Sequence, residues 1–301
     1  MSMCRNAPWN TRLSRSLASL LALLSLAAGA AFHAPATSAM AQASPSSESR
    51  SLIAKDREVR IMELGDSITA GVGANGIGGD GGYRRRLAAL LSSAGYRVTF
   101  VGRRTDFSPG LADPNHEGWP GYVIRELAPG APGQLYGPLT EEAIRRNDPD
   151  VILLMVGTND LLRYRGQDGT FSDSEIVHSM DLLLGEIFRT KPTVRVVLGG
   201  IIDSPRIDAC AVKRFDDGRS SCDEHEYPNL RDLAASYARR GNAITYADMI
   251  HVVPRSKIYF PDGIHPAGST GYDLVANAWF SAIRTITQPE GGQAISAADP
   301  R

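Results

Sequence analysis

This sequence contains few cysteines and has no large excess of either positive or negative charge. Its 301 residues include 3 cysteines, and 32 lysines and arginines are balanced by 33 aspartates and glutamates, so the net charge is -1. Lysine and arginine are scattered along the chain without runs. Because binding to nucleic acid or to anionic lipid depends on a basic surface, we do not expect nucleic acid to be a partner.

Long apolar runs are also missing, except for one near the N-terminus. Three arginines precede the apolar run Leu17–Ala31, and the small-x-small triplet Ala39-Met40-Ala41 follows it. This pattern is typical of a secretory signal peptide, here over residues 1–41. An uncleaved anchor is the alternative, but about 15 apolar residues fall short of the roughly 20 that a spanning helix needs. We therefore expect a secreted or periplasmic protein without stable membrane insertion.

The expected state of the cysteines depends on removal of this leader. Its removal takes Cys4 away and leaves Cys210 and Cys222 in an oxidising compartment, where a disulfide between them is expected. The alternative is a pair of free or metal-binding thiols. A metal site would show further Cys or His at ligand spacing, and His225 alone is too little. No metal is therefore expected.

Segments typical of strands alternate with segments of helical periodicity through the rest of the chain. Apolar runs predict strands at 59–64, 97–101, 151–156, 194–202 and 243–246. Helices are predicted at 83–94, 139–147, 228–240, from Ser172 onward and from Pro266 onward. This alternation predicts an α/β fold with a five-stranded parallel sheet and right-handed crossovers. The domain should span residues 58–287, between a Ser-rich linker at 42–57 and a loose tail at 288–301.

Polar residues follow three of the predicted strands at the point where each strand ends. Ser67 follows the first strand, Gly102 the second and Asn159 the third. The carboxyl ends of parallel strands meet at one edge of the sheet, where open α/β sheets bind ligands. Ser67 is therefore a candidate nucleophile. A serine hydroxyl is a poor nucleophile until a base takes its proton, so the sequence must also supply a histidine.

That histidine precedes the last predicted helix, in Asp262-Gly263-Ile264-His265-Pro266. At a spacing of three residues Asp262 can turn back to accept a hydrogen bond from His265, which leaves the other ring nitrogen free to face Ser67. Acyl transfer also needs donors for the oxyanion. The backbone N–H groups of Ser67 and Gly102 and the side-chain amide of Asn159 would supply them.

Four blocks, taken in order, resemble the SGNH (GDSL-type) hydrolase family. They are Gly65-Asp66-Ser67, Gly102, Gly157-Thr158-Asn159-Asp160 and Asp262-x-x-His265, and the resemblance covers about residues 59–284. It implies a three-layer, flavodoxin-like fold, serine-hydrolase chemistry and no cofactor. Without the blocks, Ser67 and Asn159 would read as turn residues and His265 as a helix cap. The oxyanion role of Asn159 rests on the resemblance.

Three shorter matches narrow the resemblance. Val59–Met62, Val101-Gly102 and His116-Glu117-Gly118 are most similar to carbohydrate-esterase family 3, whose members remove O-acetyl groups from xylan and related sugars. The resemblance implies a secreted serine esterase acting on a small ester or an acetylated polysaccharide. A short-chain lipase or thioesterase of the same family and a non-catalytic carbohydrate-binding protein are the alternatives. The cysteine-bearing insertion at 203–227 departs from those esterases and leaves the substrate open.

Two residues of the loop at 103–121 and the residue just after it are candidates for the substrate rim or for local packing. His116 could contact substrate or support the loop, while Trp119 and Tyr122 could stack on a sugar ring or pack beneath the loop. A glycine pattern nearby, Gly71–Gly76, matches the dinucleotide fingerprint G-x-G-x-x-G. A true fingerprint follows its strand immediately and opens a helix, and this one does neither, so a nucleotide cofactor is not expected.

Overall fold

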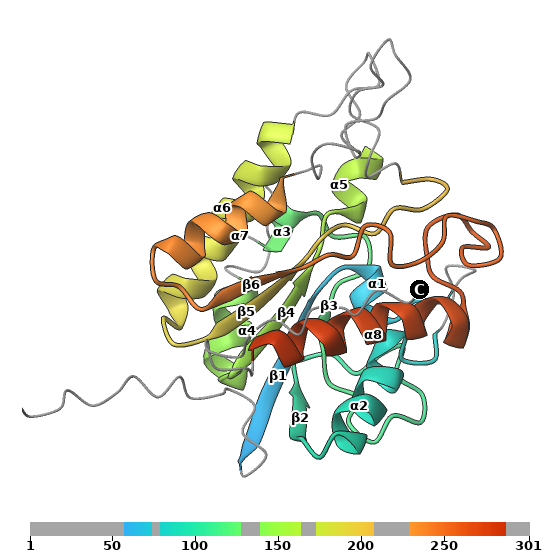
Figure 1. Cartoon of the computed structure of the whole chain (residues 1–301), viewed down its shortest axis with the longest axis horizontal. Helices are drawn as coiled ribbons and strands as arrows, with labels where there is room; N and C mark the ends of the chain where they lie inside the picture. Colours follow the sequence, from blue (N-terminus) through green and yellow to red (C-terminus); the bar gives the residue numbers. More distant parts are fainter. Residues whose placement is uncertain (1–56, 74–78, 128–138, 164–172, 208–228, 287–301) are drawn as a thin grey trace, which may run out of the picture. The chain divides into compact units, whose positions relative to one another are not determined.

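A parallel β-sheet runs through the centre of the protein, as the computed structural model in Figure 1 shows. The structure describes residues 57–73, 79–127, 139–163, 173–207 and 229–286. All of them belong to one compact unit, Glu48–Arg301. The predicted signal peptide, the predicted tail and nearly all of the predicted linker lie outside the described residues, as do Cys210 and Cys222.

Five strands form the body of the sheet in the order β2-β1-β4-β5-β6, and every pairing is parallel. They are β1 Glu58–Gly65, β2 Arg97–Val101, β4 Val151–Met155, β5 Arg195–Gly199 and β6 Ile244–Ala247. The predicted five-stranded parallel sheet is confirmed. A sixth element, β3, is only the pair Glu117–Gly118 and joins β1 beyond the end of β2. A strand of two residues shows no periodicity, so β3 could not be predicted from the sequence.

Helices cover both faces of the sheet. They are α1 Ser67–Ala70, α2 Tyr83–Ser93, α3 Ile124–Leu127, α4 Leu139–Asn147, α5 Thr158–Arg163, α6 Asp173–Thr190, α7 Leu230–Arg239 and α8 Gly268–Ile286. In Figure 1, α2 and α8 lie together on one face, and α3, α4, α6 and α7 lie on the other. This is the predicted three-layer arrangement.

Two apolar clusters hold the layers together, one on each face. Because side chains alternate along a strand, Met62 and Leu64 of β1 join the cluster under α4, α6 and α7, whereas Val59 and Ile61 join the cluster under α2 and α8. The central strand β4 is buried along its whole length. Strands covered on both faces read as continuous apolar runs, which is why this strand was easy to predict.

The strand predicted at 194–202 is shorter, since β5 ends at Gly199, and two further differences lie near the candidate site. The last helix begins at Gly268 instead of Pro266, because the backbone N–H of Ala267 bonds to the Tyr259 carbonyl at 2.6 Å and holds the preceding segment in a turn. The segment after β4, where no helix was predicted, forms the short helix α5. Both differences fall at the edge of the sheet where the candidate site lies.

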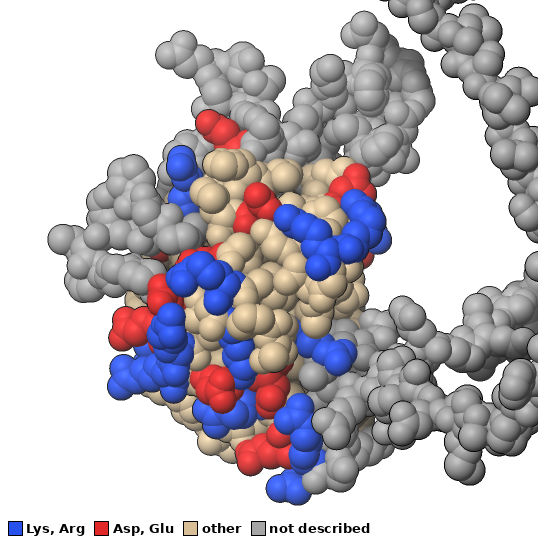
Figure 2. Space-filling model, turned by 90° about the vertical axis from the view of Figure 1, so that its left-hand side faces the viewer, with Lys and Arg blue, Asp and Glu red and all other residues tan. Residues whose placement is uncertain are grey.

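The surface carries both signs of charge. On the face shown in Figure 2, the Lys and Arg side chains are interspersed with Asp and Glu, and neither sign forms a continuous patch. Among the described helices, none combines the length and the apolar composition needed to cross a membrane.

Candidate active site

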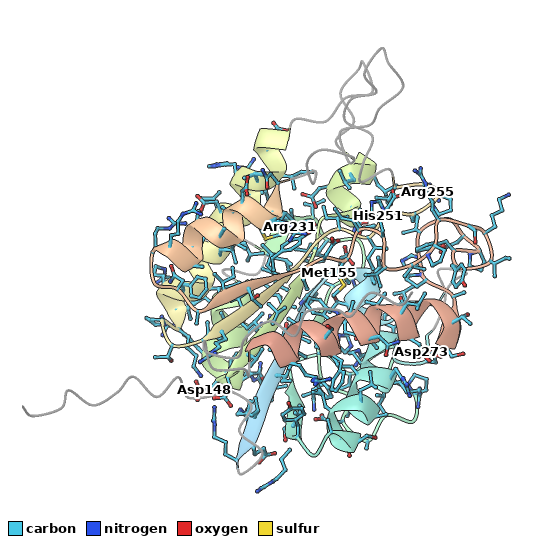
Figure 3. The ribbon with its side chains drawn as sticks, in the orientation of Figure 1. Asp148, Met155, Arg231, His251, Arg255 and Asp273 are labelled. Carbon is cyan, nitrogen blue, oxygen red and sulfur yellow. The ribbon has the colours of Figure 1, made fainter. Side chains whose placement is uncertain are left out.

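Ser67 lies at a sharp bend between β1 and α1. Asp66 caps α1, its Oδ1 accepting a 3.0 Å hydrogen bond from the Ile68 N–H, and Ser67 is the first helical residue. Gly65 is required by close packing, because a Cβ there would lie 2.1 Å from the carbonyl oxygen of Met155. Figure 3 shows Met155 at the end of β4 beside α1. The Gly-Asp-Ser sequence thus fixes where the serine hydroxyl lies.

The structure brings Ser67, His265 and Asp262 into one hydrogen-bonded row. Ser67 Oγ lies 2.8 Å from His265 Nε2, and His265 Nδ1 lies 2.7 Å from Asp262 Oδ2. A carboxylate accepts only, so Nδ1–H donates to Asp262 and the neutral ring accepts from Ser67 through Nε2. The turn also holds the acid in place, because Asp262 Oδ1 accepts from the backbone N–H groups of Ile264 and His265, each at 2.8 Å.

Asp262 is held in its ionised form. Its partial burial opposes ionisation, but the hydrogen bonds from the His265 ring and from the backbone of His265 and Ile264 outweigh burial, so the pKa of Asp262 lies below its usual value. A carboxylate at this position can fix the imidazole tautomer and stabilise the imidazolium that forms when the ring takes a proton.

The predicted oxyanion donors lie at the ends of the neighbouring strands. The N–H of Ser67 is at the first position of α1, where helical N–H groups lack intrahelical partners. Gly102 directly follows β2 and packs against the backbone of His116, and a Cβ on Gly102 would lie 2.3 Å from the His116 carbonyl carbon. Asn159 lies in the first turn of α5, and its Nδ2 donates to the Tyr122 carbonyl at 2.9 Å. That amide group has a second hydrogen for another acceptor.

The block around Asn159 is built for close packing. Gly157 has φ +136°, and a Cβ there would lie 2.4 Å from the Ile201 side chain. Asp160 is buried, accepts a 3.0 Å hydrogen bond from the Ile124 N–H and so links α5 to α3. Burial raises the pKa of Asp160 to about 7. Asp160 is therefore a structural neighbour of the site, a role the sequence did not reveal.

His116 does not lie on the substrate rim. It has no exposed surface, its Nδ1 accepts from the Gly118 N–H at 3.0 Å, and its Nε2 therefore donates to the Asp106 carbonyl at 2.9 Å. Burial, with the charge of Arg84, lowers the pKa of His116 to about 4, so the ring is neutral. The structure corrects the rim suggestion and supports the alternative, a histidine that shapes the loop.

Trp119 and Tyr122 are half-buried, and their backbones are hydrogen-bonded to Gly65 and Asn159 of the sequence blocks. The N–H of Trp119 donates to the Gly65 carbonyl at 2.8 Å, and the two rings are 5.4 Å apart between centroids. Both rings also pack against the cluster under α4, α6 and α7. The Arg104 guanidinium lies 4.5 Å from the centre of the Trp119 ring. Both aromatic side chains are therefore packed in place and remain partly exposed.

Glu117 is a second residue whose role the sequence did not reveal. It is fully buried, accepts hydrogen bonds from the backbone N–H and Nε of Arg103 at 2.7 and 2.9 Å, and accepts another from Trp119 Nε1 at 3.1 Å. The carboxylate thereby fixes the residue that follows Gly102. Among the described residues, no three His, Cys, Asp or Glu side chains are grouped as metal ligands would be.

A parallel α/β sheet with a serine, a histidine and an aspartate in line at its carboxyl edge is the arrangement found in serine hydrolases. Residues 64–274 match the GDSL-like Lipase/Acylhydrolase family, and the chain belongs to that family of carboxylic ester hydrolases. The resemblance inferred from the four sequence blocks is confirmed.

Individual relatives agree with this assignment. A multidomain esterase of Ruminococcus flavefaciens is 31% identical over 249 residues, which cover 78% of this chain but 29% of that protein. A family 3 carbohydrate esterase of Clostridium thermocellum matches the fold with a TM-score of 0.57 and 24% identity, over 77% of this chain and 100% of that one. A family 3 carbohydrate esterase of Talaromyces cellulolyticus gives 0.54 and 23%, over 76% and 98%.

Proposed function

We propose that this protein is an exported serine esterase that removes small O-acyl groups, chiefly O-acetyl, from carbohydrate. The observation that carries the proposal is the continuous row from Ser67 Oγ through His265 to Asp262, with separations of 2.8 and 2.7 Å. The sequence likeness to a multidomain esterase supports ester hydrolysis, and the fold likeness to two family 3 carbohydrate esterases supports the proposed substrate class.

In the proposed mechanism Ser67 is the nucleophile and His265 the base. Ser67 Oγ attacks the ester carbonyl carbon while its proton passes to His265 Nε2, and Asp262 stabilises the resulting imidazolium. The tetrahedral oxyanion accepts hydrogen bonds from the N–H groups of Ser67 and Gly102 and from the amide of Asn159. The intermediate collapses, and His265 returns the proton to the leaving sugar alcohol.

The acyl-enzyme is then hydrolysed by the same groups. Water gives a proton to His265 as it attacks the acyl carbon, and the second collapse releases the carboxylic acid and regenerates Ser67. No step needs a cofactor. Trp119, whose backbone N–H bonds to the Gly65 carbonyl, and Tyr122 are both partly exposed and are proposed to contact the sugar ring.

Two experiments test this proposal. The mature protein should hydrolyse p-nitrophenyl acetate, and a serine-directed phosphonate should stop turnover and add its mass to the peptide containing Ser67. A protein that neither turns over the ester nor takes up the phosphonate would instead support the non-catalytic, carbohydrate-binding alternative. Acetate release from acetylated xylan and pectin, compared with esters of rising acyl length, then separates a carbohydrate esterase from a short-chain lipase or thioesterase.

Export and the disulfide form one linked proposal. Cleavage after residue 41 would deliver the chain to an oxidising compartment, where Cys210 and Cys222 are proposed to pair and to stabilise the fold by about 3 kcal/mol on the chain-entropy account. Mass spectrometry of the exported protein without reduction decides between the states. Two alkylatable thiols in that sample would contradict the pairing.

A further inference from the structure

A fully buried arginine donates a hydrogen bond to α1, the helix that begins with Ser67. The side chain of Arg84, on α2, is 1% exposed, and lysine or arginine is almost never buried to that degree without partners. Its Nη2 donates to the Ala70 carbonyl and to Ser108 Oγ, each at 2.8 Å, and its Nη1 donates to the Pro114 carbonyl at 3.1 Å. Three acceptors from two separate segments thus meet on one guanidinium group.

The nearest carboxyl group is not the main partner of this arginine. Glu63 Oε2 lies 3.8 Å from Arg84 Nε, and among the described residues neither Glu63 oxygen nor that Nε has a hydrogen-bond partner. Burial raises the pKa of Glu63 to about 8, so near neutral pH its carboxyl group is mostly protonated. The directed bonds of Arg84 therefore go to the two carbonyls and the hydroxyl.

The first acceptor belongs to the helix that carries the nucleophile. Ala70 ends α1, the four-residue helix that begins with Ser67. Helices this short are not stable by themselves, and their last carbonyl groups have no intrahelical donors. The bond from Arg84 to the Ala70 carbonyl supplies such a donor and ties the orientation of α1, and with it the Ser67 N–H, to α2.

The other acceptors belong to the loop that shapes the surroundings of Gly102. Ser108 Oγ, which accepts from Arg84, also lies 2.9 Å from the Asp106 carbonyl. That carbonyl accepts from His116 Nε2, and the backbone of His116 packs against Gly102. A continuous series of contacts therefore runs from Ala70 through Arg84 to Gly102.

We propose that Arg84 is a positioning residue, which sets the Ser67 and Gly102 N–H groups at the separation that the oxyanion needs. The proposal rests on the function proposed above. A displacement of about 1 Å at groups that do not themselves react can cost on the order of 100-fold in rate. Arg84 never touches substrate, so its effect falls on the rate of the chemical step and not on substrate binding.

The chain offers matched controls on the same helix. Arg85 is exposed and donates to the Pro109 carbonyl at 2.7 Å, so it contacts the same loop but not α1. Arg86 is exposed and serves as a plain surface position. The comparison of Arg84→Lys and Arg84→Met with Arg85→Met and Arg86→Met separates the link to α1 from loop anchoring and from loss of charge.

The experiment measures kcat and KM for p-nitrophenyl acetate, the rate of phosphonate labelling of Ser67, and the midpoint of thermal unfolding. We expect Arg84→Lys and Arg84→Met to lower kcat by about 10- to 100-fold with KM within about threefold of wild type. Phosphonate labelling should slow by the same factor, because its tetrahedral product uses the same donors. Arg85→Met and Arg86→Met should stay within about threefold of wild type.

Each outcome bears on the proposal. Arg84→Lys that unfolds cooperatively and keeps kcat within about twofold of wild type overturns it, even if the midpoint drops, because a purely structural role moves stability alone. If Arg84→Met does not fold, Ser108→Ala removes one acceptor and should lower kcat by about 3- to 10-fold; an unchanged kcat there also overturns it. Wild-type protein without turnover or labelling would refute the proposed function itself, which is a distinguishable result.

Discussion

β1 and β4 are neighbouring central strands, yet they are built differently. Every residue of β4 is buried and apolar, from Val151 to Met155. β1 is just as buried beyond Arg60 but carries Glu63, paired in register with Leu153, on the face covered by α2 and α8. Burying a carboxyl group costs free energy that an aliphatic side chain does not. The strand that leads to the nucleophile therefore gives up stability that the other retains.

The difference between β1 and β4 indicates where this fold tolerates buried polar groups. The buried polar side chains Glu63, Thr69 and Arg84 belong to β1, α1 and α2, the first three elements of the chain. The outer half of the sheet, β5 and β6, offers a contrast, since the residues of β5 after Arg195 are buried and apolar except for the glycine at its end. Buried polar side chains also occur on other elements, such as Ser179 and Glu186 on α6, but the buried Glu63 and Arg84 lie together at the strand that ends before Ser67.

The largest expected effect lies at the end of β1. Ser67→Ala should lower kcat by about 10⁴- to 10⁶-fold, because members of a catalytic triad act as a unit. Folding should be unaffected, since the hydroxyl makes its hydrogen bond to His265 Nε2, at the edge of the sheet, and fills no part of the apolar clusters. Steady-state kinetics on p-nitrophenyl acetate give the answer, with the exposed serine change Ser92→Ala as the control. More than about a tenth of the wild-type rate in Ser67→Ala would show that the nucleophile lies elsewhere.

A smaller effect is expected just after the end of β4. Asn159→Ala should lower kcat by about 10²- to 10³-fold, the usual loss for one oxyanion donor. Asn159→Asp keeps the size of the side chain but removes both amide hydrogens, so its loss should be at least as large. If Asn159→Asp retains wild-type kcat, the amide does not donate to the oxyanion, and its bond to the Tyr122 carbonyl is its whole role.

The contrast between the strands also explains what the sequence could reveal. The apolar run of β4 and the Gly-Asp-Ser end of β1 were visible as patterns, and so were the ordered blocks that the structure brings together at one edge. Glu63 and Arg84 were not, because a charged residue in a strand or helix reads as solvent-exposed unless its partner is known. That partner is set by the packing of α2 on β1, which no local pattern encodes.

The loop after β2 shows the same limit. In the sequence, His116 suits the substrate rim and the loop interior equally well. Only its hydrogen bonds to Gly118 and Asp106 place it in the interior of the loop. Glu117 was part of a recognised motif, but its role depends on Arg103 lying across from it. The proposed reacting groups can therefore be named from the sequence, whereas the groups that hold them emerge from tertiary contacts.

The third prediction tests the buried carboxyl group of β1 through pH. Because burial raises the pKa of Glu63 from 4.5 to about 8, the folded protein binds this proton more tightly than the unfolded chain. Its contribution is therefore most favourable below pH 4.5, declines as pH rises, and levels off above about pH 8. Glu63→Gln removes that decline, which amounts to at most roughly 5 kcal/mol over the whole range.

Urea unfolding of wild type and Glu63→Gln at pH 5, 6, 7 and 8 measures this contribution. Other buried groups titrate in the same range, with the pKa of Asp160 raised to about 7 and that of His116 lowered to about 4, but they cancel in the difference between the two proteins. The free energy of unfolding of wild type should fall relative to the variant across the series. A constant difference would mean that Glu63 is ionised in the folded state throughout this range.

The smallest expected effect comes from apolar substitutions, which compare the packing of β1 and β4 without changing a charged residue. Ile152 on β4 and Ile61 on β1 are both fully buried, and each loses one methylene group when changed to valine. Ile152→Val and Ile61→Val should each lower the free energy of unfolding by about 1 kcal/mol, equally at pH 5 and at pH 8, because no titrating group is involved. Equal, pH-independent losses would show that the two strands pack alike apart from Glu63. A loss at Ile61 that grew with pH would show instead that ionisation of Glu63 loosens the packing around it, so that the two strands differ in more than one side chain.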